Sequence, residues 1–327
     1  MLRSAVERLT WRTDVLREGL IYLSENPTAR RFVRRAPGAR TMARRFVAGE
    51  TIDDAMNAAR ALNQSNMSVT LDYLGESVRN RDEARAAAEM YLQLIQRIVN
   101  DQLDANVSLK MTAMGQDIDE GFLDENLGRV LDLAQQNDMF VRFDMESSAY
   151  TQRTLDYFYR LWNGGRRNIG VVIQSYLRRS AGDIERLNQD GVRVRLCKGA
   201  YKEPASVAYP EKSDVDANYV KLAQMLLDHG TYPGFATHDE NMIRAVREYA
   251  SKIRRDPSTF EFQMLYGVRR DLQQKLAAAG YRLRVYVPFG EAWYPYLMRR
   301  MAERPANLFF IVNAVVRESP FRFLLGK

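Results

Sequence analysis

Short runs rich in apolar and β-branched residues recur along this chain, with helical stretches between them. The intervening stretches, such as 82–99, 119–136 and 214–229, place apolar residues at i, i+3 and i+4, the spacing of an amphipathic helix. Strands that alternate with helices pair in parallel through crossovers. Eight such units over about 220 residues favour a closed (βα)8 barrel of the TIM type over an open, doubly wound sheet. The runs lie at 67–73, 107–112, 140–145, 169–174, 192–198, 234–237, 260–265 and 283–287.

The first fifty residues differ from the rest of the chain in charge. The chain of 327 residues carries a net charge of +7, and residues 1–50 hold eleven arginines against five acidic residues. Such an arm suits an anionic surface or partner, or else it forms a solvated helical face. We therefore expect a basic helical arm over residues 1–50 and a catalytic barrel domain with a C-terminal helix over residues 51–327.

The scarcity of cysteine and histidine limits the chemistry. Cys197 is the single cysteine, which excludes an intramolecular disulfide and a cysteine-based zinc or iron–sulfur site. His229 and His238 are too few for a histidine-rich metal centre, so we expect no metal. No apolar run reaches the ~18 residues of a membrane span, and no secretory signal is present, so we expect a cytoplasmic protein.

Polar side chains gather where the predicted strands end. In a (βα)8 barrel the C-terminal ends of the strands form one rim, which carries the active site. Singly, each side chain has a structural alternative, such as a helix cap for an aspartate after a strand. Together they predict a site on the rim. The residues are Lys110, Asp144, Gln174, Arg195, Lys198, Tyr201, Thr237, His238 and Tyr286.

The helix predicted after the eighth strand adds a more specific feature. Arg299, Arg300 and Glu303 lie three, four and seven residues after Tyr296, so the four side chains share one helix face. A phenol ring beside two guanidinium groups suits a small ligand with an apolar body and a carboxylate. The alternative is an exposed arginine pair bridged to Glu303.

Six ordered blocks of this sequence closely resemble the bacterial monofunctional proline dehydrogenases, which are related to the proline dehydrogenase domain of bifunctional proline utilisation enzymes. The resemblance covers about residues 46–306. It implies a distorted (βα)8 barrel that holds FAD, with the eighth helix over the barrel mouth. It also implies oxidation of L-proline to Δ1-pyrroline-5-carboxylate, with hydride transfer from C5 to FAD and reoxidation by a membrane quinone. The blocks are Val107–Lys110, Phe143–Glu146, Arg195–Tyr201, Ala236–Asp239, Glu261–Gly267 and Tyr296–Arg300.

The resemblance implies roles for individual residues. Asp144 and Arg195 are the implied catalytic residues, the second near the reactive edge of the flavin. Lys110, Arg299 and Arg300 would bind the substrate carboxylate. The implied contacts of the proline ring are Ala200, Tyr201, Leu265, Tyr286 and Tyr296. The implied FAD contacts are Met145, Gln174, Arg195, Lys198, Gly199, Ala200, Thr237, His238 and Glu303.

Two other functions fit the residues without the resemblance. A Schiff-base aldolase or lyase also places a lysine at a strand end, and Lys110 or Lys198 would serve. The arginine-rich arm could instead bind nucleic acid, with the barrel as scaffold. The resemblance favours proline dehydrogenase and no nucleic acid. It implies a pyrroline-5-carboxylate dehydrogenase as a partner, and residues 1–45 are expected to contact the anionic inner face of the cytoplasmic membrane.

Overall fold

The computed structural model contains a closed barrel of eight parallel strands. It describes residues 43–75 and 78–303, apart from the side chains of residues 299–303. The strands lie in chain order around the barrel, and β8 pairs with β1 to close it. The predicted barrel is therefore confirmed and the open sheet is wrong. The strands are β1 Ser68–Tyr73, β2 Ala105–Leu109, β3 Val141–Phe143, β4 Ile169–Gln174, β5 Arg193–Cys197, β6 Gly234–Ala236, β7 Glu261–Leu265 and β8 Leu283–Phe289.

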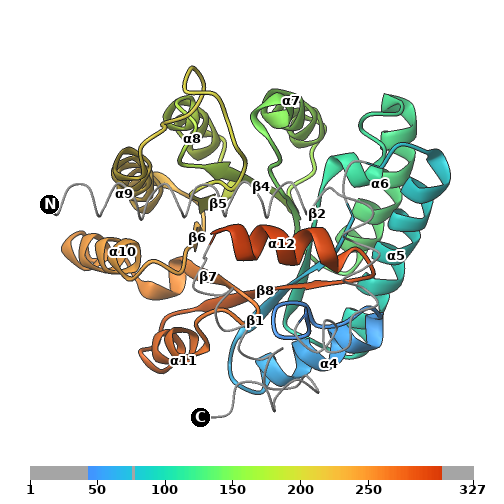
Figure 1. Ribbon diagram of the computed structural model, residues 1–327, viewed down its shortest axis with the longest axis horizontal. Helices are drawn as coiled ribbons and strands as arrows, with labels where there is room; N and C mark the ends of the chain where they lie inside the picture. Colours follow the sequence, from blue (N-terminus) through green and yellow to red (C-terminus); the bar gives the residue numbers. More distant parts are fainter. Residues whose placement is uncertain (1–42, 76–77, 304–327) are drawn as a thin grey trace, which may run out of the picture.

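Helices surround the barrel on its outside (Figure 1). Thr51 and Asp54 form a reciprocal capping box at the start of α4. Asn80 and Asp119 cap α5 and α6 by accepting from backbone N–H groups three residues further on. The helices are α4 Ile52–Asn63, α5 Arg81–Asn100, α6 Glu120–Gln136, α7 Ser148–Asn163, α8 Ser180–Gln189, α9 Lys212–His229, α10 Glu240–Lys252, α11 Arg270–Ala278 and α12 Trp293–Glu303, with the 3-10 turns η1 Met111–Met114 and η2 Pro257–Thr259.

The hydrophobic core lies between the strands and the helices. Val107, Val171 and Leu196 belong to the strands, are fully buried and pack in one cluster with helix residues such as Leu127 and Tyr219. β4 is the nearly continuous apolar run expected of a parallel strand covered on both faces, whereas β2, β5 and β7 also contain polar residues. The polar side chains of these strands alternate with the core residues and therefore point into the barrel.

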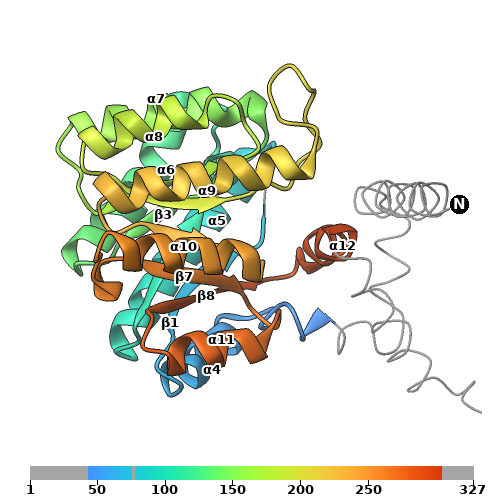
Figure 2. The same cartoon turned by 90° about the vertical axis from the view of Figure 1, so that its left-hand side faces the viewer.

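Two helices make the barrel irregular. α12 follows β8 and crosses the barrel at the C-terminal ends of the strands (Figures 1 and 2). α4 precedes β1 and packs against both β8 and β1, on the outer wall where the helix after β8 lies in a regular barrel. The predicted distortion, with the eighth helix over the barrel mouth, is confirmed.

The last residues of the predicted arm contact the barrel. The Ala48 N–H donates to the Pro288 carbonyl at 2.9 Å, and the Gly49 carbonyl accepts from the Gly290 N–H at 2.9 Å. Trp293 Nε1 donates to Glu50 at 2.9 Å, which ties the same segment to α12. Residues 1–42 lie outside the described part of the chain, so the domain division at residue 50 stays a prediction.

Most strand limits agree with the prediction to within one or two residues. The range 169–174 matches β4, whereas the predicted strand 107–112 ends at Leu109. Met111–Met114 form a 3-10 turn whose four residues are all buried, so their composition resembles that of a strand. Within the described ranges, none of the helices combines the length and hydropathy that a membrane crossing requires.

Candidate active site

Asp144 is the centre of a buried network at the C-terminal end of the barrel. Its Oδ1 accepts from Ser108 Oγ at 2.5 Å and from Arg195 Nη1 at 2.8 Å. Its Oδ2 accepts from the Tyr286 hydroxyl at 2.7 Å and lies 3.7 Å from Lys110 Nζ. We call these five residues the Asp144 network. One carboxylate thus collects donors from β2, β5 and β8, and these charge-assisted bonds fix its orientation.

Lys110 lies between two carboxylates. Its Nζ is 3.2 Å from Oδ1 of Asp72 on β1 and 3.7 Å from Asp144. Burial raises the pKa of Asp72 to about 6; the Lys110 charge opposes this shift and the Asp144 charge adds to it. Asp72, which adjoins the Asp144 network, therefore changes its charge near pH 6, directly beside the lysine implied to bind the substrate.

Arg195 is held from two directions. Its Nε donates to Gln263 Oε1 on β7, and its Nη1 donates to Asp144. The guanidinium carbon lies 5.2 Å from the centre of the Tyr286 ring, a cation–π contact. Burial and the charge of Asp144 raise the pKa of Tyr286 well above its usual value, so its hydroxyl remains a donor. Among the residues that the structure describes, Arg195 Nη2 is buried without a hydrogen-bond partner, which leaves this donor for a ligand.

A second group of predicted residues lies at the ends of β4, β6 and β7. Gln174 ends β4 and is buried, and its Oε1 accepts no hydrogen bond within the described ranges. The Thr237 N–H donates to the Gln263 carbonyl at 3.1 Å, which joins the end of β6 to β7. His238 Nε2 accepts from the Leu265 N–H at 2.9 Å, so the neutral ring carries its proton on Nδ1. These bonds fix the rim beside the Asp144 network.

The loop after β5 carries four further predicted residues. Lys198 Nζ contacts Asp216 at 2.5 Å and Asp239 at 2.8 Å. Gly199 has a φ of +106°, and a Cβ there would overlap the ring of Tyr176, so this turn needs glycine. The other two, Ala200 and Tyr201, are half-buried, as Gly199 is, and Met145 after β3 is buried.

The remaining predicted residues lie on α12. Tyr296 is buried on this helix. Arg299, Arg300 and Glu303 belong to its helical backbone, which crosses the barrel mouth (Figure 1). Their side chains lie outside the described part of the structure, so the roles implied for them stay predictions.

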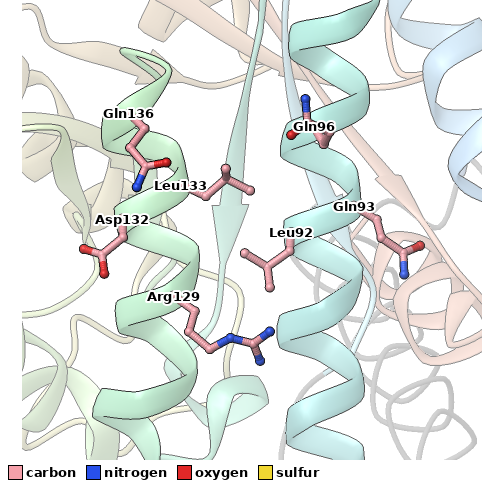
Figure 3. A pocket seen from close by; sticks show the side chains of 7 residues that line it. All are labelled: Leu92, Gln93, Gln96, Arg129, Asp132, Leu133 and Gln136. Atoms are coloured by element: carbon pink, nitrogen blue, oxygen red, sulfur yellow. The ribbon is translucent and has the colours of Figure 1, made fainter.

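A groove of about 530 Å³ lies away from this site, between α5 and α6 on the outer wall (Figure 3). Its charged residues pair at the surface, Arg129 with Glu89 at 2.6 Å and Asp132 with Arg166. No lining residue of the groove is buried, and none belongs to the predicted site. The lining residues are Leu92, Gln93, Gln96, Arg129, Asp132, Leu133 and Gln136.

Three residues in or beside this network were not predicted. Asp72 and Gln263 lie within strands rather than after them, and so does Ser108. Side chains two positions apart in a strand face the same side, so Ser108 lies on the same face as Lys110, and Gln263 on the same face as Leu265. This alternation is a sequence signal that would have placed Ser108 and Gln263 on the site face of their strands, although it does not show which side chains they contact.

Comparison with known proteins identifies the family. Residues 55–313 match the sequence model described as proline dehydrogenase. The chain belongs to the proline dehydrogenase family. It is 42% identical over 304 residues to proline dehydrogenase 1 of Bacillus subtilis subsp. natto, a match that covers 93% of this chain and 100% of that protein. It is 39% identical over 308 residues to proline dehydrogenase of Deinococcus radiodurans, covering 93% and 99%.

A solved structure agrees with this assignment. Proline utilization A from Bdellovibrio bacteriovorus, inactivated by N-propargylglycine, matches with a TM-score of 0.74 and 30% identity, covering 80% of this chain and 32% of that one. This chain thus spans about a third of that larger protein. Enzymes of the proline dehydrogenase family are FAD-dependent oxidoreductases. The resemblance is confirmed, and proline dehydrogenase is favoured over the Schiff-base aldolase.

Proposed function

We propose that this protein oxidises L-proline to Δ1-pyrroline-5-carboxylate with FAD as its cofactor. The observation that carries the proposal is the Asp144 network, in which Lys110, Arg195 and Tyr286 converge on one buried carboxylate. Buried charges are costly, so such a cluster at a barrel mouth indicates a ligand that needs them. Proline has a carboxylate and an amine, and membership of the proline dehydrogenase family supports the same substrate.

The residues present fit a flavin. Gln174 Oε1 and Arg195 Nη2 are buried polar atoms without hydrogen-bond partners among the described residues, and a flavin edge offers both donors and acceptors. When bound, FAD supplies the acceptor for the hydride that leaves C5 of proline. The residues proposed to hold FAD are Met145, Gln174, Arg195, Lys198, Gly199, Ala200, Thr237, His238 and Glu303.

The substrate carboxylate is proposed to bind Lys110, Arg299 and Arg300. A guanidinium group binds a carboxylate through two parallel hydrogen bonds, and an ammonium group adds a point charge. Fixing the carboxylate orients C5 and lowers the entropic part of the barrier. The side chains proposed to surround the five-membered ring are Ala200, Tyr201, Leu265, Tyr286 and Tyr296.

Asp144 organises the donors around the substrate. Its carboxylate holds the Arg195 guanidinium and the Tyr286 hydroxyl through separate oxygens, at 2.8 Å and 2.7 Å. Proline must lose its amine proton before hydride leaves C5, so the neutral amine is the competent form. We propose that the network binds this form, with Asp144 keeping the charge of Arg195 balanced while the substrate binds.

The lysines themselves argue against the Schiff-base alternative. A Schiff-base lysine must be a neutral amine, which enzymes favour with an apolar site or a neighbouring cation. Lys110 instead contacts Asp72 and Asp144, and Lys198 contacts Asp216 and Asp239. Each lysine is thus held in ion pairs with carboxylates, which differ from the apolar or cationic surroundings that activate a Schiff-base lysine.

Electron transfer to a membrane quinone requires contact with the membrane. We propose that residues 1–45 provide this contact through their arginines, at ~1 kcal/mol per basic residue near an anionic surface. The product would then pass to a pyrroline-5-carboxylate dehydrogenase. Liposomes with anionic lipid at low salt test the arm: equal binding of the full chain and a variant lacking residues 1–45 would remove this part of the proposal.

The test of the reaction is an anaerobic visible spectrum of the purified protein before and after L-proline is added. The proposal expects a flavin absorption that bleaches with L-proline and stays unchanged with D-proline. A protein that binds FAD but is not reduced by L-proline would contradict the substrate assignment. A protein that does not bind added FAD would contradict the cofactor, and borohydride trapping of Lys110 and Lys198 would then test the aldolase.

A further inference from the structure

We infer that Glu261 positions Arg195 through the amide of Gln263, so that Glu261 and Gln263 are positioning residues for flavin reduction. The inference rests on the proposed function, because that function gives Arg195 its place beside the flavin. Neither residue has a hydrogen bond to Lys110 or Tyr286, the members of the Asp144 network that are implied to bind the substrate. Both act on the reaction only through the orientation of the Arg195 guanidinium.

A chain of buried side chains leads along the barrel interior to Arg195. Glu261 Oε1 accepts from Arg284 Nε on β8 at 2.8 Å and from Gln263 Nε2 at 2.5 Å. Gln263 Oε1 in turn accepts from Arg195 Nε. Glu261, Gln263 and Arg195 are each no more than 5% exposed. We call Arg284, Glu261 and Gln263 the interior chain.

The donors and acceptors on either side of Gln263 allow only one orientation of its side-chain amide. A guanidinium group only donates and an ionised carboxylate only accepts, whereas an amide does one at each end. Rotating the amide by half a turn would set donor against donor at Arg195 and acceptor against acceptor at Glu261. By accepting from the amide nitrogen of Gln263, Glu261 therefore orients the carbonyl oxygen of Gln263 toward Arg195.

Glu261 is ionised, as this orientation of the Gln263 amide requires. Burial acts to raise the pKa of Glu261, but the Arg284 charge, the hydrogen bonds from Arg284 and Gln263 and the charge of Arg142 outweigh it and leave the pKa lowered. The carboxylate thus stays ionised at neutral pH and remains an acceptor only.

The two anchors of Arg195 determine where its last donor points. Gln263 holds Nε, and Asp144 and Ser108 hold Nη1, so bonds at two of its nitrogens fix the planar guanidinium. The direction in which Nη2 can donate is then fixed as well; Nη2 is the buried donor that has no partner in the described part of the chain. Removal of the Gln263 bond would leave the guanidinium held at Nη1 alone, so its plane could turn about that atom.

Gly234 makes room for the interior chain. In the sheet register, Gly234 on β6 lies between Arg195 on β5 and Glu261 on β7. A Cβ at this position would overlap Nε2 of Gln263. The amide therefore occupies space that any other residue at position 234 would fill, and a methyl group there would displace it without altering any hydrogen-bonding group.

Gln263→Met tests the inference with least disturbance. Methionine has a similar length, removes both amide bonds and keeps the ion pair between Glu261 and Arg284, which a change at Glu261 would break. In the FAD-loaded protein we expect flavin reduction by L-proline to slow by about 10- to 100-fold, since small misplacements cost this much. The KM for proline should change less than twofold. We also expect a more negative flavin reduction potential, because a loosened cation stabilises the reduced flavin less.

Gly234→Ala is the second variant, and Thr70→Val is the matched control. Gly234→Ala should slow reduction and shift the potential in the same direction, so the test survives if Gln263→Met fails to fold. Thr70 donates to Asn106 at 2.5 Å, and both are buried in the same barrel interior. Thr70→Val should leave rate and potential unchanged while removing a comparable buried hydrogen bond.

Two results would overturn the inference. The first is a folded Gln263→Met or Gly234→Ala protein with the rate and potential of the parent chain. The second is an equal loss in Thr70→Val, which would indicate a general effect of interior hydrogen bonds. Failure of the proposed function is distinguishable, because the parent chain itself would then not be reduced by L-proline.

Discussion

The groove between α5 and α6 and the mouth of the barrel each contain an arginine–carboxylate ion pair. Arg129 and Glu89 lie 2.6 Å apart, with side chains 45% and 51% exposed. Arg195 and Asp144 lie 2.8 Å apart, with side chains 6% and 11% exposed. Water screens the first pair, whereas the second acts in a low-dielectric interior where each lost partner leaves a buried charge. The proposed site is therefore distinguished by charges that are buried and multiply bonded, whereas the charges of the groove are exposed.

Asp144→Asn is expected to slow flavin reduction more than Asp72→Asn beside the same network or Arg129→Met in the groove. The amide keeps the shape but removes the charge that holds Arg195, Tyr286 and Lys110 together. Flavin reduction by L-proline should slow by about 100-fold or more, the usual effect of losing an electrostatic partner at a reacting centre. Rapid mixing under anaerobic conditions measures this rate. A variant with normal FAD content and a rate within fivefold of the parent would show that the network is not the site.

Asp72→Asn is expected to have a smaller effect that depends on pH. The ionised carboxylate holds Lys110, and it loses its charge as the pH falls through about 6. The parent chain should therefore show an inflection of kcat/KM near pH 6, with activity rising above it. The variant should lack this inflection and be about tenfold slower at pH 8, the loss of one charged hydrogen bond.

The same pKa has a consequence for stability. The pKa of Asp72 is raised from 3.8 in the unfolded chain to about 6 in the folded chain. The stability that this carboxyl group contributes is therefore fully present below pH 3.8 and is lost as the pH rises through about 6. The parent chain should lose more stability between pH 5 and pH 8 than Asp72→Asn. Urea unfolding at both pH values measures the difference, and equal losses would mean that Asp72 does not titrate in this range.

The smallest effect is expected for Arg129→Met in the groove. An exposed ion pair contributes about 0–1 kcal/mol, so stability should change little. Flavin reduction should stay within twofold of the parent chain, because the pair lies on the outer wall. A larger loss of activity would assign the groove a part in catalysis and remove the contrast between the two regions.

Local patterns predict most of the barrel but not its irregular parts. β4 is predicted to the residue because polar Asn168 and Ser175 bound an apolar run. The strand before Lys110 is predicted too long, because the buried turn Met111–Met114 has the same apolar composition. Periodicity predicts a helix after β8, but it does not predict that this helix crosses the barrel mouth. That expectation came from the resemblance.

Local sequence patterns predict part of the candidate site in the same way. Lys110, Asp144, Arg195 and Tyr286 were predicted because they lie at or near strand ends, and the structure brings them together. Gln263 was missed because its contact with Arg195 spans β5 to β7 and depends on the space at Gly234. Such a contact depends on register and barrel closure, which no single segment of the sequence contains.

The most direct measurement compares Arg195→Met with Arg129→Met in one anaerobic rapid-mixing experiment with L-proline. Each substitution removes one arginine of a well-formed ion pair, one from each region. We expect flavin bleaching to slow by about 10³-fold in Arg195→Met, and by less than twofold in Arg129→Met. Similar rates in the two variants, at equal FAD content, would contradict the claim that the buried network at the barrel mouth is the active site.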